Sequence, residues 1–396
     1  MAIWRLPRFS RDQPWIGGNR LTEIDPGSEK SARRRSRTRF PAPGAVEATL
    51  RGFDGARLTF EQAEASLDAA ADRLSIRQSR WESDEFNILA ISGGAAGGAF
   101  GAGALIGLTR ARLRPSFAIV TGVSTGALIA PFAFLGPQWD GRLREAYTGG
   151  FAQESLGVTS LSLTFDGGLF QPEALERLVH PFVDDALVAA VAAEHTRGRR
   201  LLVATTDLDR QTPCIWDMGA IASKGGPLAT RMFREVLIAS ASLPGLFPPR
   251  RFEVEANGRR YEELHVDGGV SAPLFVLPEA LLRWRNLGRR IPRGRIYILV
   301  NTVLDPAPQT TPISLPSILL RSFDTMLRVS YRQALSVASI PDTQSATDPG
   351  GMLRFETASM KKTFEAAVRA AQSDAFWRAP VARTEPWTDF LDFLAR

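Results

Sequence analysis

The sequence contains few of the residues that crosslink proteins or bind metals. Among its 396 residues there are one cysteine, Cys214, and three histidines. A single cysteine excludes an internal disulfide framework, and three histidines are too few for a histidine-rich metal site. We therefore expect neither a disulfide scaffold nor a bound metal, and we expect no other cofactor.

Acidic side chains are missing over a long stretch, between Glu85 and Asp140. This stretch contains a glycine-rich run after an apolar segment, a context that also occurs in nucleotide-binding sites. A dinucleotide site needs an acidic residue about 20 residues beyond the glycines, and a P-loop needs a lysine followed by serine or threonine. Neither is present, so we do not interpret the run as a nucleotide site.

The first residues lack a continuous apolar segment, because Arg5, Arg8 and Arg11 interrupt it. A secretory signal peptide needs such a segment, so we expect no export by that route and favour a cytoplasmic or peripheral membrane location. Two uncharged runs, 88–109 and 115–139, are long enough to span a bilayer. Because both contain several glycines, we interpret them as buried strand-loop-helix units.

Positive charge is concentrated at the beginning of the chain. Residues 1–40 contain ten basic and four acidic side chains, a difference equal to the net charge of +6 of the whole sequence. Such a segment suits anionic lipid or nucleic acid, but a solvated, disordered extension is the more common outcome. We therefore expect a disordered tail over 1–45 and no nucleic-acid partner.

Apolar segments alternate with helical patterns along the rest of the chain. Buried strands are expected over 86–91, 117–120, 201–206 and 297–300, and a hairpin is expected over 251–266. Strands separated by helices form largely parallel sheets with helices on both faces. We therefore predict a three-layer α/β/α fold with a mostly parallel central sheet. A helical lead-in over 46–80 would precede the main domain, 81–396, whose motifs lie in 86–301 and whose helical end spans 302–396.

Ser124 lies in the pattern G-x-S-x-G, between an apolar run and a helix-capable run. A serine at a sharp strand-to-helix turn exposes its hydroxyl at the carboxyl edge of a sheet, and Gly122 and Gly126 allow the strand and the helix to approach closely. The positive end of the following helix stabilises an oxyanion formed there. Ser124 is therefore a candidate nucleophile, although in the alternative it only caps the helix.

A nucleophilic serine needs a base, and two residues qualify. Asp267 ends the second arm of the predicted hairpin and is followed by Gly268–Gly269, which leave its carboxylate uncovered. His265 is the alternative, because the order Ser124, Asp207, His265 matches that of α/β-hydrolases. A carboxylate base is expected to stay active well below about pH 6, whereas a histidine base loses activity below about 6.5.

The glycine-rich run Ser92–Gly98 follows the first expected strand, and its bare N–H groups suit the oxyanion of acyl transfer. Five motifs in this order resemble the patatin-like phospholipase family. They are the loop 92–98, the elbow 122–126, the segments 204–208 and 239–249, and the motif Asp267-Gly268-Gly269-Val270. The resemblance covers residues 86–301 and implies hydrolysis of lipid acyl esters, with lipid as substrate and contact with a membrane surface.

The resemblance also implies roles for individual residues. Ser124 would be the nucleophile and Asp267 the base of a serine-aspartate dyad that needs no metal. The oxyanion hole would be formed by the loop, at Gly93, Gly94, Ala95 and Gly97. Ser240 and Ser242 are expected at a helix end that lines the pocket.

Two features depart from the family pattern. The family loop usually has a third glycine followed, two places on, by a basic residue, where this chain has Ala95 and Gly97. A catalytically silent lipid-binding module of the same fold is therefore an alternative. A second Asp-Gly-Gly begins at Asp166 and is a weaker candidate for the base.

The helical pattern over 317–335 is expected to pack on the core, with a membrane-surface helix as the alternative.

Overall fold

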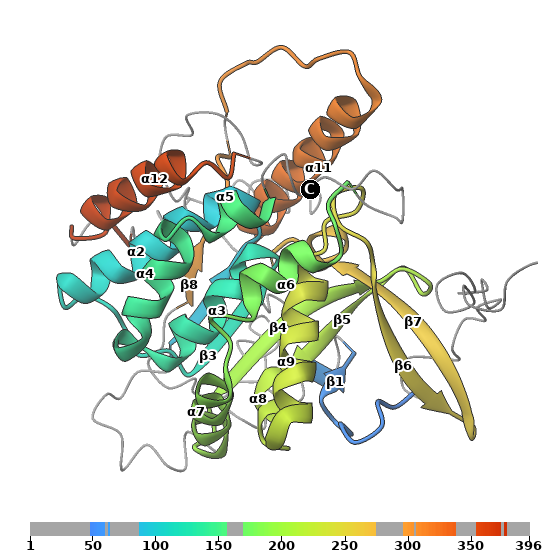
Figure 1. Ribbon diagram of the computed structural model, residues 1–396. Coiled ribbons are helices and arrows are strands. Elements are labelled where there is room, and N and C mark those ends of the chain that lie inside the picture. Colours follow the sequence, from blue (N-terminus) through green and yellow to red (C-terminus); the bar gives the residue numbers. More distant parts are fainter. Residues whose placement is uncertain are drawn as a thin grey trace, which may run out of the picture. The chain divides into compact units, whose positions relative to one another are not determined.

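The structure of the protein is a computed structural model, and Figure 1 shows the arrangement of its helices and strands. It describes residues 48–59, 62–63, 87–156, 169–274, 296–304, 306–337, 354–373 and 376–377. The predicted tail 1–45, most of the lead-in 46–80 and Asp166 lie outside the described residues.

The centre of the fold is a sheet in which four neighbouring strands are parallel (Figure 1). They are, in spatial order, β8 (Ile296–Leu299), β2 (Ile88–Ile91), β3 (Ile119–Val123) and β4 (Arg200–Asp207). Antiparallel strands extend the sheet beyond β4. They are β5 (Thr212–Asp217) with β1 (Arg57–Leu58), and β7 (Arg259–Asp267) with β6 (Arg250–Ala256). The predicted α/β fold with a mostly parallel central sheet is confirmed.

The character of each strand follows from its place in the sheet. Every residue of β2, β3 and β4 is buried, as expected for parallel strands covered on both faces. The outer strand β6 instead alternates buried and exposed residues. Its hairpin with β7 closes at Asn257 and Gly258, whose φ angles of 51° and 70° suit a tight two-residue turn. The predicted hairpin is therefore present.

Helices cover the sheet on both faces. Alternate side chains such as Leu89, Val120 and Leu201 join the main core on one face. The helices that contribute to this core are α2 (Gly98–Arg110), α3 (Thr125–Leu135), α4 (Asp140–Thr148), α5 (Phe151–Leu156), α6 (Glu173–Val179), α7 (Asp185–Thr196), α8 (Met218–Ala222), α9 (Gly226–Ser240) and α12 (Thr357–Ala370). On the other face Ala90 clusters with Leu327 of α11 (Leu315–Val337).

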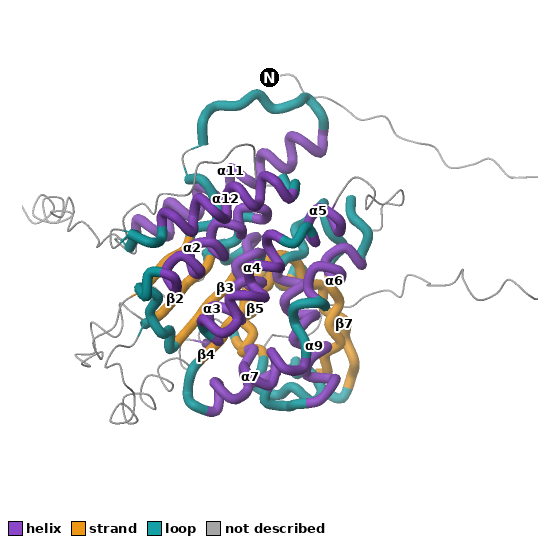
Figure 2. Tube along the Cα trace, turned by 60° about the vertical axis from the view of Figure 1, so that its left-hand side comes forward, coloured by secondary structure: helices purple, strands orange, loops and turns teal. Residues whose placement is uncertain are grey.

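The helices α2 and α12 pack closely against each other (Figure 2). A side chain on Gly103 or Gly107 of α2 would collide with the backbone carbonyls of Phe364 and Val368 of α12. The small residues of α2 therefore have a packing role. The helix α2 directly follows the glycine-rich loop.

The two long uncharged runs of the sequence form buried strand-loop-helix units, as predicted. The run 88–109 contains β2 and α2, and the run 115–139 contains β3 and α3. Among the helices that the structure describes, none combines the length and the apolar content that crossing a bilayer requires.

Candidate active site

Ser124 occupies the turn between β3 and α3 with φ 56° and ψ −126°, a conformation that residues with a side chain rarely adopt. Its two flanking glycines are needed for the turn. A side chain on Gly126 would collide with the Ile91 carbonyl, and one on Gly122 would lie 2.6 Å from the Gly126 carbonyl oxygen. The sequence thus forms a strained elbow in which strand and helix backbones touch.

Strand pairing along β4 brings Asp267 to Ser124. The strand β3 pairs with β4 up to Val123, which lies opposite Ala204. The strand β7 pairs with the following residues of β4, and Asp267 lies opposite Thr205. The elbow and the end of β7 therefore meet, and Ser124 Oγ donates a 2.6 Å hydrogen bond to Asp267 Oδ2.

The carboxylate of Asp267 is buried, with 2% of the residue exposed. Burial raises its pKa to about 7, although hydrogen bonds from the Ser124 hydroxyl and the Gly269 N–H act in the opposite direction. The backbone is fixed on both sides, because the Asp267 N–H donates to the Ser242 carbonyl at 2.9 Å and Thr206 Oγ1 donates to the Asp267 carbonyl at 2.9 Å. Asp267 is thus a buried carboxylate on a fixed backbone, with a pKa raised to about 7.

The glycine-rich loop lies against the elbow. The point where a side chain on Gly93 would begin is 3.1 Å from Ser124 Cβ. Among the residues that the structure describes, none accepts a hydrogen bond from the N–H of Gly93, Gly94 or Ala95. Gly94 has φ 148° and Ala95 has φ 49°, so the loop reverses direction at these residues. Three N–H groups are therefore available to an anion beside Ser124.

The structure contradicts the prediction that Gly97 belongs to the oxyanion hole. Its N–H donates to the Gly94 carbonyl at 2.9 Å, so it is not available to an oxyanion. A side chain on Gly97 would collide with the carbonyl of Asn301, which follows β8. Asn301 Nδ2 donates to the Ser92 carbonyl at 2.8 Å, and Asn301 Oδ1 accepts from the Gly101 N–H at 3.0 Å. Asn301 holds both ends of the loop, and no sequence motif had marked it.

Ser240 and Ser242 support the elbow from the end of α9. The Ser124 N–H donates to Ser240 Oγ at 3.0 Å, and Ser240 Oγ donates to the Ala204 carbonyl at 2.7 Å. Because the Ser124 N–H is used in this way, it does not contribute to an oxyanion site. Both serines are fully buried, and Ser242 Oγ donates to the Ile238 carbonyl at 2.8 Å. Both serines therefore support the elbow, and the helix end that carries them lines the cavity beside Ser124 through Leu237 and Ala241, as predicted.

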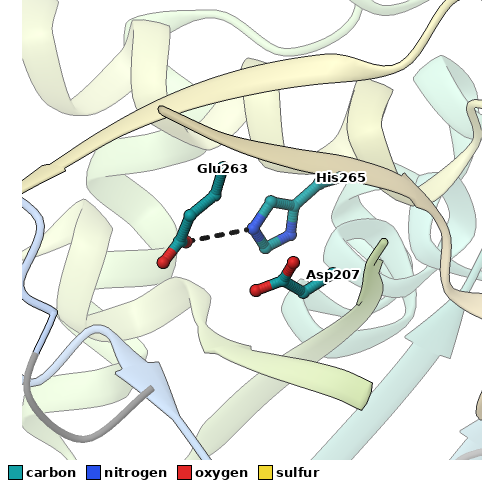
Figure 3. Close-up of side chains that lie close together, drawn as sticks. All are labelled: Asp207, Glu263 and His265. Atoms are coloured by element: carbon teal, nitrogen blue, oxygen red, sulfur yellow. Dashed lines mark hydrogen bonds and ion pairs between the residues drawn. The ribbon is translucent and has the colours of Figure 1, made fainter. Parts of the chain in front are cut away.

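His265 does not contact Ser124. Its Nδ1 lies 2.9 Å from Thr205 Oγ1. Its Nε2 lies 3.3 Å from Glu263 Oε2 (Figure 3). Asp207 Oδ1 accepts hydrogen bonds from two N–H groups of the following turn, so Asp207 braces a loop. The geometry therefore does not support the alternative triad of Ser124, Asp207 and His265.

Asp207, Glu263 and His265 form a buried cluster whose ligand atoms lie within 4.8 Å of one another (Figure 3). Two guanidinium groups already neutralise it. Arg210 pairs with Asp207 and with Glu263 Oε1 at 2.6 Å, and Arg57 pairs with Glu263. Burial would raise the pKa of Glu263, but the hydrogen bond with His265 and these two cations lower it overall. We interpret the cluster as a structural ion-pair network.

A cavity opens beside Ser124 and Asp267, and its wall is almost entirely apolar. The side chains that line it away from the dyad include Leu128, Phe132, Ala146, Ala152, Leu156, Leu175, Leu178, Val179, Phe182, Val183, Leu237, Leu243, Leu246, Phe247 and Met360. Asp267 is the only charged residue of the wall formed by the described part of the chain. The cavity suits an apolar chain whose carbonyl group lies between Ser124 and the free N–H groups.

Comparisons with known proteins found one matching family model and several similar solved structures. The family model described as patatin-like phospholipase matches residues 89–279. Two similar solved structures are VipD from Legionella pneumophila and human GIVD cytosolic phospholipase A2. The first is 11% identical with a TM-score of 0.30 and covers 72% of this chain and 67% of that chain. The second is 12% identical with a TM-score of 0.41 and covers 85% and 65%. No curated protein is similar enough in sequence to match.

Proposed function

Because this chain contains a patatin-like phospholipase domain, a family whose members are usually lipid acyl hydrolases, we propose that it hydrolyses acyl esters of lipids with a serine-aspartate dyad. Ser124 is the nucleophile and Asp267 is the general base. The observation that carries this proposal is the 2.6 Å hydrogen bond from Ser124 Oγ to Asp267 Oδ2. It joins a strained elbow serine to a buried carboxylate, beside N–H groups that have no acceptor among the described residues.

The proposed reaction uses the residues of the site in two steps. Ser124 Oγ attacks the ester carbonyl carbon while Asp267 takes the hydroxyl proton, and the N–H groups of Gly93, Gly94 and Ala95 stabilise the oxyanion. Collapse of this intermediate passes the proton to the leaving alcohol and leaves an acyl-enzyme. Water, activated by Asp267, then attacks the acyl group and releases the fatty acid and Ser124. General-base assistance contributes about 10²- to 10⁴-fold, and each oxyanion donor about 10²- to 10³-fold.

Two surfaces support a lipid substrate. The apolar cavity can take a hydrocarbon chain, because burial of each methylene contributes about 0.8 kcal/mol. The helix α11 lines the cavity through Leu327 and Tyr331, while its outer side exposes Leu319 (59%), Met326 (58%) and Val329 (46%). The expectation that this helix packs on the core thus holds for one side. Its exposed side supports contact with a lipid surface near the cavity.

A panel of esters tests the proposed function. We expect hydrolysis of phospholipids, lysophospholipids and long-chain p-nitrophenyl esters, with faster turnover above the critical micelle concentration of each substrate. The Ser124→Ala variant should be inactive on all of them. Turnover of short soluble esters alone would favour a carboxylesterase. The absence of both hydrolysis and labelling by a fluorophosphonate would favour a silent lipid-binding module.

The pH dependence of kcat/KM should follow Asp267. Because the base must be ionised and burial raises its pKa to about 7, kcat/KM is expected to fall about tenfold per pH unit below that value. This replaces the expectation of activity well below pH 6, and it means that pH alone does not separate an aspartate base from a histidine base. A His265→Gln variant separates the two, since with Asp267 as the base the midpoint of its pH profile should equal that of the wild-type protein. A midpoint that disappears in this variant would identify His265 as the base.

A further inference from the structure

Tyr331 of α11 borders the candidate active site from the face of the sheet opposite the main core. It is 1% exposed, and it lines the same cavity as Ser124 and Asp267. The point where a side chain on Gly93 would begin is 3.2 Å from Tyr331 Oη and 3.6 Å from Ser124 Oγ. Both hydroxyl groups therefore border the small space that Gly93 leaves empty.

The hydroxyl of Tyr331 has no hydrogen-bond partner among the described residues, although it is fully buried. The nearby Ser92 hydroxyl already donates to the Gly93 carbonyl at 2.7 Å and accepts from the Asn301 N–H at 2.9 Å. Buried hydroxyl groups nearly always have a partner, because losing contact with water without one disfavours folding. An unpaired hydroxyl that faces a cavity is therefore expected to meet its partner in a ligand.

We propose that Tyr331 is a side-chain donor of the oxyanion site. Its O–H would donate a hydrogen bond to the carbonyl oxygen of the ester as negative charge develops there, together with the N–H groups of Gly93 and Gly94. Tyr331 keeps its proton throughout, and Ser124 and Asp267 carry out the proton transfers. This inference rests on the proposed acyl-ester hydrolysis and adds to it a catalytic residue that lies outside the residues matched by the family model.

Two further observations suit Tyr331 to this role. Burial raises the pKa of its hydroxyl far above the ordinary value and the negative charge of Asp267 acts in the same direction, whereas the nearby Ser92 hydroxyl lowers it, so Tyr331 keeps its proton at neutral pH. The helix α11 also packs against the turn that follows Asp267, because a side chain on Gly269 would begin 3.3 Å from Leu327, one turn before Tyr331. A rigid donor aimed at developing charge is the arrangement that electrostatic catalysis requires.

The test compares Tyr331→Phe with the wild-type protein. We expect kcat to fall about 10²-fold with little change in KM, because one oxyanion donor is lost. Affinity for a long-chain trifluoromethyl ketone, which forms a charged tetrahedral adduct with the serine, should fall by a similar factor. Affinity for a long-chain alkyl ether, which has no carbonyl group, should not change. The melting temperature should stay the same or rise, since an unpaired buried hydroxyl is removed.

Tyr147→Phe is the matched control for a structural hydroxyl. Tyr147 is also buried and also lines the cavity, but its hydroxyl lies 3.0 Å from Thr125 Oγ1. This variant should lower the melting temperature, in contrast to Tyr331→Phe. Wild-type kcat and wild-type ketone affinity in Tyr331→Phe would overturn the inference, as would an equal loss of ketone and ether binding. A wild-type protein that hydrolyses no ester would instead contradict the proposed function itself.

Discussion

Replacing Asp267 by asparagine is expected to lower kcat for acyl-ester hydrolysis by about 10²- to 10⁴-fold, the range for loss of a general base. The amide keeps the shape of the carboxylate, its oxygen can accept from the Gly269 N–H, and its NH2 group can donate to Ser124 Oγ, but it cannot take the proton. Steady-state kinetics on a long-chain p-nitrophenyl ester measures this effect. His265→Gln is the control, because both nitrogens of His265 lie next to residues other than Ser124.

The same substitution is expected to stabilise the fold at neutral and alkaline pH. Burial raises the pKa of Asp267 from its ordinary value to about 7 in the folded protein, so the folded state holds a proton that the unfolded state has released. The free energy of unfolding therefore decreases as pH rises from about 4 to about 7. Asp267→Asn removes this loss, which is at most about 4 kcal/mol.

Thermal melts at pH 5 and pH 8 measure the stability effect. The variant should melt at a higher temperature than the wild-type protein at pH 8, and the difference should shrink as pH falls toward 4. A variant that is less active and also less stable at pH 8 would show that Asp267 serves the fold rather than the reaction. Gain of stability together with loss of activity is the combination expected of a buried base.

Gly126→Ala is expected to destabilise the protein by about 3 kcal/mol or more. The added methyl group would collide with the Ile91 carbonyl and lie 2.6 Å from the Ser92 carbonyl oxygen, and neither backbone group can turn aside. To relieve the clash, α3 must move away from β2, which displaces Ser124 from Asp267. Urea unfolding should therefore show a lower midpoint, and the remaining folded protein should hydrolyse esters slowly.

Gly141→Ala is the matched control for the elbow glycine. Gly141 lies in α4, and a side chain there would meet no atom within 4 Å. An alanine is expected to be neutral or to stabilise the helix by up to about 1 kcal/mol. Equal urea midpoints for the two variants would contradict the conclusion that close backbone contact fixes the elbow.

Local patterns predicted the parts of the fold that depend on local chemistry. The strands β2, β4 and β8 were predicted because they are short apolar runs buried on both faces, and the hairpin of β6 and β7 because Asn257-Gly258 favours a tight turn. The helix α12 lies within the predicted helical end 302–396, whereas the strand β5 and the helix α7 were not predicted. The strand β5 starts with exposed residues and is held by pairing with β4 and β1, which its own sequence does not indicate.

In the candidate site, too, residues in local motifs were predicted, whereas residues that act through distant contacts were not. Ser124 and Asp267 were singled out because each lies in a short motif whose glycines permit an unusual backbone. Asn301 has no motif of its own, and the motif 239–249 that contains Ser240 does not indicate which group Ser240 contacts. Asn301 acts through contacts with the glycine-rich loop, and Ser240 acts through the Ser124 N–H. Such roles arise from contacts between distant parts of the chain, and they emerge only when the sheet brings those parts together.

The most direct test of the central claim is the rate at which a fluorophosphonate modifies Ser124. The account predicts that the wild-type protein is labelled at one serine, with a rate that rises with pH to a plateau above about pH 7, where Asp267 is ionised. Ser124→Ala should not be labelled, and Asp267→Asn should react far more slowly without that pH dependence. Labelling of Ser124→Ala at the wild-type rate, or an unchanged rate in Asp267→Asn, would contradict the pairing of nucleophile and base proposed here.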